Sequence, residues 1–462
     1  MALVAGGAAG GLASASCMSA PGVIHLGLGA FHRAHQALVF DALRRSHGGQ
    51  WSVLAFSMRE PRVAEQLAGN RFRYHVRMGD AQATRWLACH GITQTAVLAR
   101  DPLHLVRSMA TPQARWVTLT VTEKGYTNAL AALLMAGLRE RWRAGLGGLT
   151  LASCDNLHNN GRHLRKLCER ACEGEPVLWQ WIQANCTFPN SMVDRIVPAT
   201  TPELVEDCSR AVGIADPVAV ATETFWEWVL EDRLAHPGDA DVLRAAGVQV
   251  VDDVAPFEVA KLNLLNGSHS ALACLGALLG IDTVDQVVAQ NDLRDWIEAL
   301  MLEDLGPGLQ RQDWPTYAQA LLRRFANPTL GHRTHQICND LSQKIPQRWQ
   351  APILRARAMG RIPQHLALAA ALAMRYWQGK RESGVAYSMQ DPQASEVHRL
   401  ALLHAGDVDA TVESLGRLPS LWGEDLTRDR AWLEAVKCSL QSIRDKGVRA
   451  SLNQLNQLSK VA

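Results

Sequence analysis

DVAPFEVAKLNLLNGSHSALACLGALLG, residues 253–280, is the stretch on which the fold of this chain depends. Asp253 can cap the start of a helix, Pro256 suits a first turn, and Gly280 can end it. Most of the stretch is apolar, as expected for a helix buried between two domains. The sequence therefore predicts one long interior helix over residues 253–280.

This mostly apolar helix carries Glu258, Lys261, Asn266 and His269. At about 100° per residue they fall within a sector of roughly 140°, so they share one side of the helix. Lys and His are costly in apolar surroundings unless they are paired or hydrogen-bonded. A Lys that releases a proton, an Asn that holds an oxygen and a His that orients a hydroxyl suit carbonyl and alcohol chemistry. A core helix with a few satisfied polar residues is the alternative interpretation.

Length and composition narrow the class of protein. The chain has 462 residues, enough for two or three domains, with 47% hydrophobic and 20% charged residues. A net charge of +2 offers no basic surface for nucleic acid or for an anionic membrane. The ten cysteines lack paired spacing, which favours reduced thiols in a cytoplasmic protein, and no metal site is expected. No apolar run is long and clean enough to span a membrane.

Residues 1–22 are rich in Ala, Gly and Ser and contain no Lys or Arg. A secretory signal needs a basic start, so we expect a disordered leader here, with Met18 as an alternative start. The ordered chain is expected to begin at Val23.

An expected strand at residues 23–26 is followed by GLGAFHRAHQ, which has the pattern of a dinucleotide-binding turn. Gly27 and Gly29 would let the backbone approach a pyrophosphate at the start of a helix over about residues 33–46. His32 stands where a third glycine is usual, so a tight turn without a ligand is the alternative.

A second expected strand, residues 51–57, bears on the choice of cofactor. It ends in Met58-Arg59-Glu60, where Glu60 could hold a ribose hydroxyl. Arg59 could instead stack on adenine or meet a 2′-phosphate. These residues leave NAD and NADP both open.

Strand and helix signals then alternate, which predicts a doubly wound, mostly parallel sheet with helices on both faces. Beyond residue 250 nearly every signal is helical. We therefore expect a dinucleotide-binding Rossmann-like domain at 23–250 and a mainly α-helical substrate and catalytic domain at 251–462. The further expected elements are strands at 115–122 and 149–153 and helices at 128–144 and 161–172.

The ends of these strands should meet at one edge of the sheet, where ligands bind. The turn at Gly27, the segment 122–126 and the segment 154–157 could therefore line a single cleft. Taken singly, Glu123, Lys124 and Asp155 are more typical of solvated loop charges.

Six motifs occur in an order that covers roughly residues 22 to 400. They are HLGLGAFHRAHQ, TLTVTEKGY, SCDNLHNNG, MVDRIVPATTP, VAPFEVAKLNLLNGSHSALA and SQKIPQR. Together they resemble the polyol-specific long-chain dehydrogenases, the mannitol dehydrogenase family. The resemblance implies hydride transfer, without a metal, between a nicotinamide cofactor and a sugar-derived secondary alcohol or ketone.

The same resemblance assigns expected roles to individual residues. Lys261 matches the catalytic acid/base, and Asn156 and Asn266 match the amides that hold the reacting oxygen. His269 matches the residue that orients the substrate, and Glu258 matches a carboxylate on the proton path. Asp194 and Lys344 match substrate-hydroxyl contacts. The cofactor is expected at Gly27, Leu28, Gly29, Phe31, Arg33, Arg59, Thr122, Glu123 and Lys124.

The segment 332–348 bears on the substrate. An acid substrate needs a cation for its carboxylate, preferably a planar guanidinium, and this segment supplies Arg333, Lys344 and Arg348. Gln336 replaces an Arg of mannitol-type members and could bind a hydroxyl. We therefore expect the pair D-mannonate and D-fructuronate, with Arg333, Gln336 and Lys344 as substrate contacts. Mannitol and fructose are the alternative pair, and a solvated helical surface is the alternative role of these side chains.

Two other classes of function are weighed against a dehydrogenase. One is a catalytically silent sugar- or nucleotide-binding protein, and the other is an epimerase or lyase that uses a bound cofactor. The intact set of Lys261, Asn156, Asn266 and His269 favours the dehydrogenase. The expected partner is a small molecule, and the sequence leaves the oligomeric state open.

Overall fold

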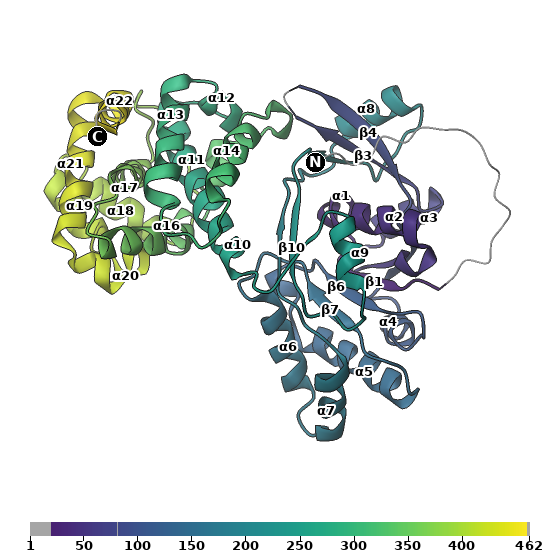
Figure 1. Cartoon of the computed structure of the whole chain (residues 1–462). Coiled ribbons are helices and arrows are strands. Elements are labelled where there is room, and N and C mark those ends of the chain that lie inside the picture. Colours follow the sequence, from purple (N-terminus) through teal and green to yellow (C-terminus); the bar gives the residue numbers. More distant parts are fainter. Residues whose placement is uncertain (1–19, 81, 460–462) are drawn as a thin grey trace.

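The computed structural model describes residues 20–80 and 82–459, so the leader expected over residues 1–22 lies almost wholly outside them. An α/β part formed by the N-terminal half lies beside an all-helical part formed by the C-terminal half (Figure 1). The expected fold class, a Rossmann-like doubly wound sheet followed by a mainly helical domain, is confirmed.

The central sheet has five parallel strands in the order β5-β2-β1-β6-β7. Val23 of β1 pairs with Val53 of β2 on one side and with Trp116 of β6 on the other. The strand order reverses between β1 and β6, and ligands of such sheets bind at this reversal. The strands are β1 (Val23–Leu26), β2 (Val53–Ser57), β5 (Ile92–Val97), β6 (Trp116–Leu119) and β7 (Thr150–Ser153).

Helices cover both faces of this sheet, so its inner strands are buried throughout. Val23 belongs to the apolar cluster that contains Phe40 of α2, and the next residue, Ile24, belongs to the cluster that contains Leu134 of α5. The helices of this part are α1 (Ala30–Ala34), α2 (Gln36–His47), α3 (Arg62–Gly69), α4 (Pro102–Met109), α5 (Asn128–Arg143), α6 (Asn160–Ala171) and α7 (Pro176–Asn185).

The helix expected at 33–46 is two helices, because the backbone breaks at His35 with φ −126° and ψ −95°. Tertiary contacts use the groups at this break: Arg195 donates to the carbonyl of Ala34, and the His35 ring lies 3.1 Å from the carbonyl of Glu227. The strand expected at 115–122 ends at Leu119, and the strand expected at 51–57 begins at Val53.

Two small sheets complete the α/β part. In one, β3 (Tyr74–Gly79) pairs antiparallel with β4 (Thr84–Cys89) and parallel with β9 (Val220–Glu223). In the other, β10 pairs antiparallel with β8 and parallel with β11. The remaining elements are β8 (Ser191–Asp194), β10 (Glu227–Glu231), β11 (Gln249–Val251), α8 (Pro202–Val212) and α9 (Asp239–Ala245).

The organising helix runs without interruption from Ala255 to Leu279, but its middle is a π-helix. It consists of α10 (Ala255–Ala260), the π segment Lys261–Gly267 and α11 (Ser268–Leu279). The helix therefore begins two residues later than expected, and Asp253 accepts a hydrogen bond from the backbone N–H of Ala255 at 3.0 Å. Gly280 ends it with φ 74°, as expected.

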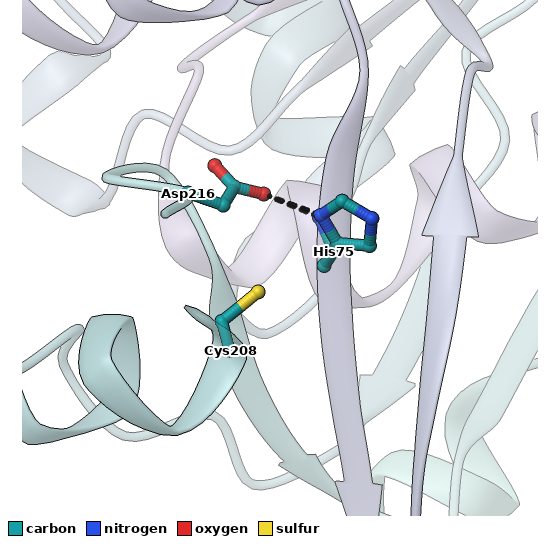
Figure 2. Close-up of side chains that lie close together, drawn as sticks. All are labelled: His75, Cys208 and Asp216. Atoms are coloured by element: carbon teal, nitrogen blue, oxygen red, sulfur yellow. Dashed lines mark hydrogen bonds and ion pairs between the residues drawn. The ribbon is translucent and has the colours of Figure 1, made fainter. Parts of the chain in front are cut away.

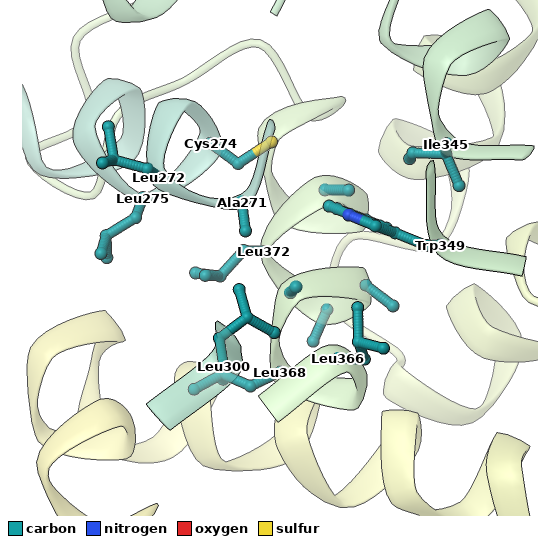
Figure 3. Packing of buried hydrophobic residues seen from close by; sticks show 14 of the residues in the cluster. Ala271, Leu272, Cys274, Leu275, Leu300, Ile345, Trp349, Leu366, Leu368 and Leu372 are labelled. Carbon is teal, nitrogen blue, oxygen red and sulfur yellow. The ribbon is translucent and has the colours of Figure 1, made fainter. Parts of the chain in front are cut away.

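The helical part packs around α11. Ala271, Leu272 and Leu275 of α11 meet Leu368 and Leu372 of α17 in the interior (Figure 3). The other helices are α12 (Val284–Val288), α13 (Asn291–Ala299), the π segment Leu300–Leu305, α14 (Trp314–Phe325), α15 (Thr334–Ile337), α16 (Leu341–Ala358), α17 (Gln364–Tyr376), α18 (Ala394–Leu403), α19 (Val408–Leu415), α20 (Pro419–Arg428), α21 (Arg430–Lys446) and α22 (Val448–Ser459).

The expectation that no segment could cross a membrane needs a correction. Within the described residues, the helix Ala255–Leu279 is long and apolar enough to do so. Most of its apolar length is buried inside the protein, so its composition is that of a core helix.

Two buried arginines of the helical part bind carboxylates of the α/β part. Arg324 of α14 pairs with Asp194 at 2.6 Å and with Glu223 at 2.8 Å. Arg311 pairs with Glu227 at 2.8 Å. All five side chains are nearly excluded from solvent. The two halves of the chain are therefore held together by charge-assisted hydrogen bonds as well as by apolar packing.

Candidate active site

A cavity of about 590 Å³ lies where the two parts of the chain meet. Its walls come from the segments that follow β7 and include β8 and, on the other side, from the helix Ala255–Leu279 and from α16. The cavity brings together the five residues that were expected to be catalytic. Its polar side chains include Asn156, His158, Asp194, Glu258, Lys261, Asn266, His269, His332, Gln347 and Arg348.

Lys261 is the first residue of the π segment and reaches across to the α/β part. Its ammonium donates to Asn156 Oδ1 and to the carbonyl oxygen of Val193, each at 2.6 Å. Burial lowers the pKa of Lys261 below its ordinary value, and the carboxylate of Asp194 opposes this shift. A lysine with a lowered pKa can take up and release a proton nearer to neutral pH.

Asn266 and His269 lie further along the same helix and line the same cavity. A π-helix bonds residue i to residue i+5, so it aligns Lys261 with Asn266, which a regular helix would place farther apart. His269 stacks on Phe325, with ring centroids 5.3 Å apart. Its Nε2 is buried and has no hydrogen-bond partner among the described residues. Burial and the nearby His332 hold the pKa of His269 well below its usual range, so the imidazole is neutral at pH 7.

Glu258 lies about one helical turn before Lys261 and lines the same cavity. Its carboxylate is 3.0 Å from Nδ1 of His158, a side chain that is 72% exposed. Burial raises the pKa of Glu258, and His158 opposes this shift. A carboxyl with a raised pKa next to an exposed imidazole can pass protons between the cavity and solvent.

Asp155 has a structural role that its charged side chain does not reveal, because in sequence it resembles a solvated loop charge. It is buried and accepts hydrogen bonds from the backbone N–H groups of Val121 and Thr122 at 3.0 and 2.8 Å. Tyr126 also donates to it at 2.8 Å. Asp155 therefore ties the end of β6 to the loop that carries Asn156. Its position directly after a buried strand was the available signal.

The expected substrate contacts are only partly brought together. Asp194 lines the cavity, but Arg324 and Tyr317 already bind its carboxylate. Arg333 and Gln336 are exposed and lie outside the cavity wall. Lys344 also lies outside it and donates to the carbonyl of Ile337 at 3.0 Å.

Arg348 is the cation of this segment that lines the cavity. Its Nη1 donates to the carbonyl of Asn266 at 3.1 Å and to Ser270 Oγ at 2.6 Å. No carboxylate forms an ion pair with Arg348 in the described part of the chain. Burial lowers the pKa of Arg348 to about 10, which still leaves it charged at neutral pH. His332 and Gln347 accompany it and were not expected as contacts.

The expected cofactor turn lies at the carboxyl end of β1. Gly27 has φ +105°, and a Cβ there would lie 2.1 Å from the carbonyl oxygen of Thr120, so this position requires glycine. Gly29 differs, because its backbone is extended and a Cβ would meet nothing closer than 3.7 Å. Packing does not explain glycine at this position, whereas the close approach of a pyrophosphate does. The turn therefore fits a dinucleotide, which the first turn of α1 would hold.

The other expected cofactor residues differ in exposure. Arg59, Glu123 and Lys124 are exposed at the ends of β2 and β6. Thr122 adopts φ 62°, a left-handed conformation that Asp155 stabilises through the Thr122 N–H. Arg33 is buried behind the turn at 3% exposure. Burial lowers the pKa of Arg33 to about 10.

A Rossmann-type turn and a cavity that holds an amide-bound lysine are together typical of a nicotinamide-dependent dehydrogenase. Residues 21–240 match the model of the mannitol dehydrogenase Rossmann domain, and residues 253–444 match that of the mannitol dehydrogenase C-terminal domain. The chain therefore belongs to the mannitol dehydrogenase family and is an oxidoreductase of that family.

Two similar proteins align with nearly the whole chain. D-mannonate oxidoreductase of Escherichia coli K12 is 36% identical, over 92% of this chain and 94% of that protein. Mannitol 2-dehydrogenase of Phaeosphaeria nodorum is 33% identical, over 94% of this chain and 81% of that protein.

Solved structures of similar proteins have the same fold. A substrate-free D-sorbitol dehydrogenase is 27% identical with a TM-score of 0.86, and 94% of this chain and 95% of that chain are covered. The ternary complex of Pseudomonas fluorescens mannitol 2-dehydrogenase with NAD and D-mannitol is 31% identical with a TM-score of 0.76. The coverage there is 95% of this chain and 94% of that chain.

Proposed function

We propose that this chain catalyses the NAD-dependent, reversible interconversion of D-mannonate and D-fructuronate. The bound nicotinamide would accept or supply the hydride. Mannitol and fructose are the second candidate pair. D-mannonate oxidoreductase and mannitol 2-dehydrogenases are both among the similar proteins, so the difference between the pairs must come from side chains of the cavity.

The protein's own part in the reaction is to move a proton and to hold an oxygen. In the oxidative direction, neutral Lys261 takes the hydroxyl proton, and the amides of Asn156 and Asn266 stabilise the charge that develops on oxygen. In the reductive direction, protonated Lys261 returns the proton to the ketone oxygen. Neutral His269 would orient the substrate through its buried Nε2, which no other described residue engages. No metal is needed for this chemistry, so activity is expected to survive exhaustive chelation.

The position of Arg348 in the cavity is the observation that supports an acid substrate. Arg348 is a half-buried cation without a carboxylate partner in the residues described, and it lines the same cavity as Lys261. Its bonds to Asn266 and Ser270 use Nη1 alone. A buried guanidinium is stabilised by an anion, and a planar carboxylate is the anion that it binds best. A neutral polyol would offer this cation only neutral hydrogen-bond acceptors, which bind it less strongly than a carboxylate does.

The test is kcat/KM for D-fructuronate and for D-fructose with NADH. The wild type should prefer fructuronate by at least about tenfold. Arg348→Met should lower the value for fructuronate by about 10- to 100-fold, as expected for the loss of a charged hydrogen bond, and change the value for fructose much less. A tenfold preference of the wild type for fructose would overturn the choice of substrate.

Arg333→Met is the matched control, because Arg333 lies in the same segment but outside the cavity. It should leave both values near those of the wild type. The same assays with NADPH test the cofactor, and NADH should be the better reductant. Stoichiometric binding of NADH and substrate without turnover would support a silent binding protein, and failure to accumulate NADH from both mannonate and mannitol would support an epimerase or lyase.

A further inference from the structure

A second cluster of reactive side chains lies behind the cofactor turn, apart from the active-site cavity. It consists of His75 on β3, Cys208 on α8 and Asp216 in the segment before β9. All three residues are buried, and one ligand atom of each lies within 4.8 Å of the others. Figure 2 shows that the three side chains converge from these three elements, with the carboxylate and the sulfur on the Nδ1 side of the imidazole.

We propose that His75, Cys208 and Asp216 form a zinc site. An imidazole nitrogen, a thiolate sulfur and a carboxylate oxygen are the three kinds of ligand that proteins offer to Zn²⁺. A mixed set of nitrogen, sulfur and oxygen suits this borderline-soft ion better than Ca²⁺ or Mg²⁺, which take oxygen ligands. One thiolate and one carboxylate also balance the charge of a divalent ion.

The surroundings of Asp216 hold its carboxylate in place for this role. Oδ1 accepts hydrogen bonds from the backbone N–H of Val218 at 3.0 Å and from the Asn70 amide at 3.3 Å. Oδ2 faces His75, whose backbone N–H and Nδ1 lie at 2.7 and 3.0 Å. Partners that fix a ligating carboxylate in this way are typical of metal sites.

A bound ion would change the hydrogen bonds of the His75 imidazole. With its proton on Nδ1 it donates to Asp216, and its Nε2 is then a buried acceptor without a partner among the described residues. If Nδ1 binds the ion, the proton moves to Nε2. Because His75 also lines a cavity of about 380 Å³, water there could accept a hydrogen bond from that new donor.

The same cavity gives the ion a route from solvent. Asn70, His75 and Asp216 lie in its wall, whereas Arg71 and Arg73 at its edge are exposed. Charges on exposed side chains are screened by solvent, so they weaken a buried ion less than its direct anionic ligands stabilise it. On binding, the ion displaces the thiol proton of Cys208, which leaves to solvent.

One residue, Tyr74, connects the site to the cofactor turn. Tyr74 precedes His75 on β3, and its hydroxyl donates to the carbonyl of Arg33 in α1 at 2.7 Å. An ion at His75 would therefore stiffen the strand that supports α1, without touching the groups that carry out hydride transfer. Its expected effect is on stability rather than on turnover.

Cobalt(II), which binds in zinc sites and reports its ligands by absorption, is the probe. The metal-free full-length protein is titrated with Co²⁺ without oxygen, as wild type, Cys208→Ser and His75→Gln. The wild type should bind one equivalent, with the charge-transfer band of a thiolate ligand. Both variants should bind at least about tenfold more weakly, and Cys208→Ser should lack that band. Zn²⁺ should raise the melting temperature of the wild type but not that of Cys208→Ser or His75→Gln.

The control is Cys17→Ser/Cys438→Ser, which removes the exposed Cys438 and the N-terminal Cys17 and keeps Cys208. It should bind Co²⁺ as the wild type does. If one ligand variant fails to fold, the other still tests the site, because each removes one ligand of the same cluster. Absence of the band from the control and the wild type, or equal binding by folded Cys208→Ser, would overturn the proposal.

Discussion

Lys261 is the residue whose loss should separate cofactor binding from turnover. Its hydrogen bonds go to Asn156 and Val193 and not to the turn after β1. We expect Lys261→Ala to bind NADH with nearly unchanged affinity and to lose turnover by a factor of about 10² to 10⁴, the usual share of general acid/base catalysis. Fluorescence titration with NADH and steady-state kcat measure the two effects.

Lys166→Ala is a control for this experiment, because Lys166 is an exposed lysine on α6. It should behave as the wild type in both measurements. Near-normal turnover of a folded Lys261→Ala protein would exclude Lys261 as the acid/base.

The lowered pKa of Lys261 also predicts opposite pH profiles for the two directions. Oxidation needs the neutral amine, so its kcat should rise with pH and level off above an inflection below 10.5, the ordinary lysine value. Reduction needs the ammonium, so its kcat should fall as pH rises through the same inflection. Profiles that keep this inflection in the residual activity of Lys261→Ala would assign it to another group.

At the scale of elements, the turn between β1 and α1 is where the cofactor prediction can be tested by a single substitution. A Cβ at Gly29 would meet nothing closer than 3.7 Å in the protein itself, so we expect Gly29→Val to fold. The added methyl groups would occupy the place of the pyrophosphate, and NADH binding should be lost. Calorimetric titration gives the affinity, and circular dichroism checks the fold. If folded Gly29→Val binds NADH normally, the turn has only a structural role.

The elements that sequence predicts well are those fixed by local signals. Strand β1 and the end of the long helix at Gly280 are where the sequence placed them, since glycine and apolar runs act over a few residues. The π segment could not be predicted, because its backbone carbonyls accept hydrogen bonds from side chains that are distant in the sequence. Arg348 donates to Asn266 O and Trp349 donates to Gly267 O, and both donors are about 80 residues away.

The same distinction applies to the candidate site. Lys261, Asn266 and His269 were found because their spacing on one helix is visible in the sequence. Asp194 was expected to meet substrate, yet its oxygens bind Arg324, which lies 130 residues further along the chain. These two residues meet only because the helical part packs against the α/β part.

At the scale of the whole molecule, Arg324 is the residue that joins the two halves electrostatically. It binds Asp194 and Glu223, and all three side chains are buried. Removal of the guanidinium leaves two carboxylates buried without compensation. We expect Arg324→Leu to lower the free energy of unfolding by about 3 to 5 kcal/mol, the usual cost of breaking a buried ion pair. Arg417→Leu, which removes an exposed pair with Glu413, should cost no more than about 1 kcal/mol.

The pH dependence of that loss identifies its cause. Burial alone would raise the pKa of Asp194, but Arg324 holds it below its ordinary value. A folded-state pKa below the unfolded one means that Asp194 stabilises the wild type above the unfolded value of 3.8, and that this contribution is lost as pH falls through the folded pKa. In Arg324→Leu the buried carboxyls take up protons more readily. As pH falls, the free-energy penalty of burying them therefore decreases. The difference in urea midpoint between wild type and variant should therefore be largest near neutral pH and shrink toward acid. A difference independent of pH would attribute the loss to packing of the arginine side chain instead.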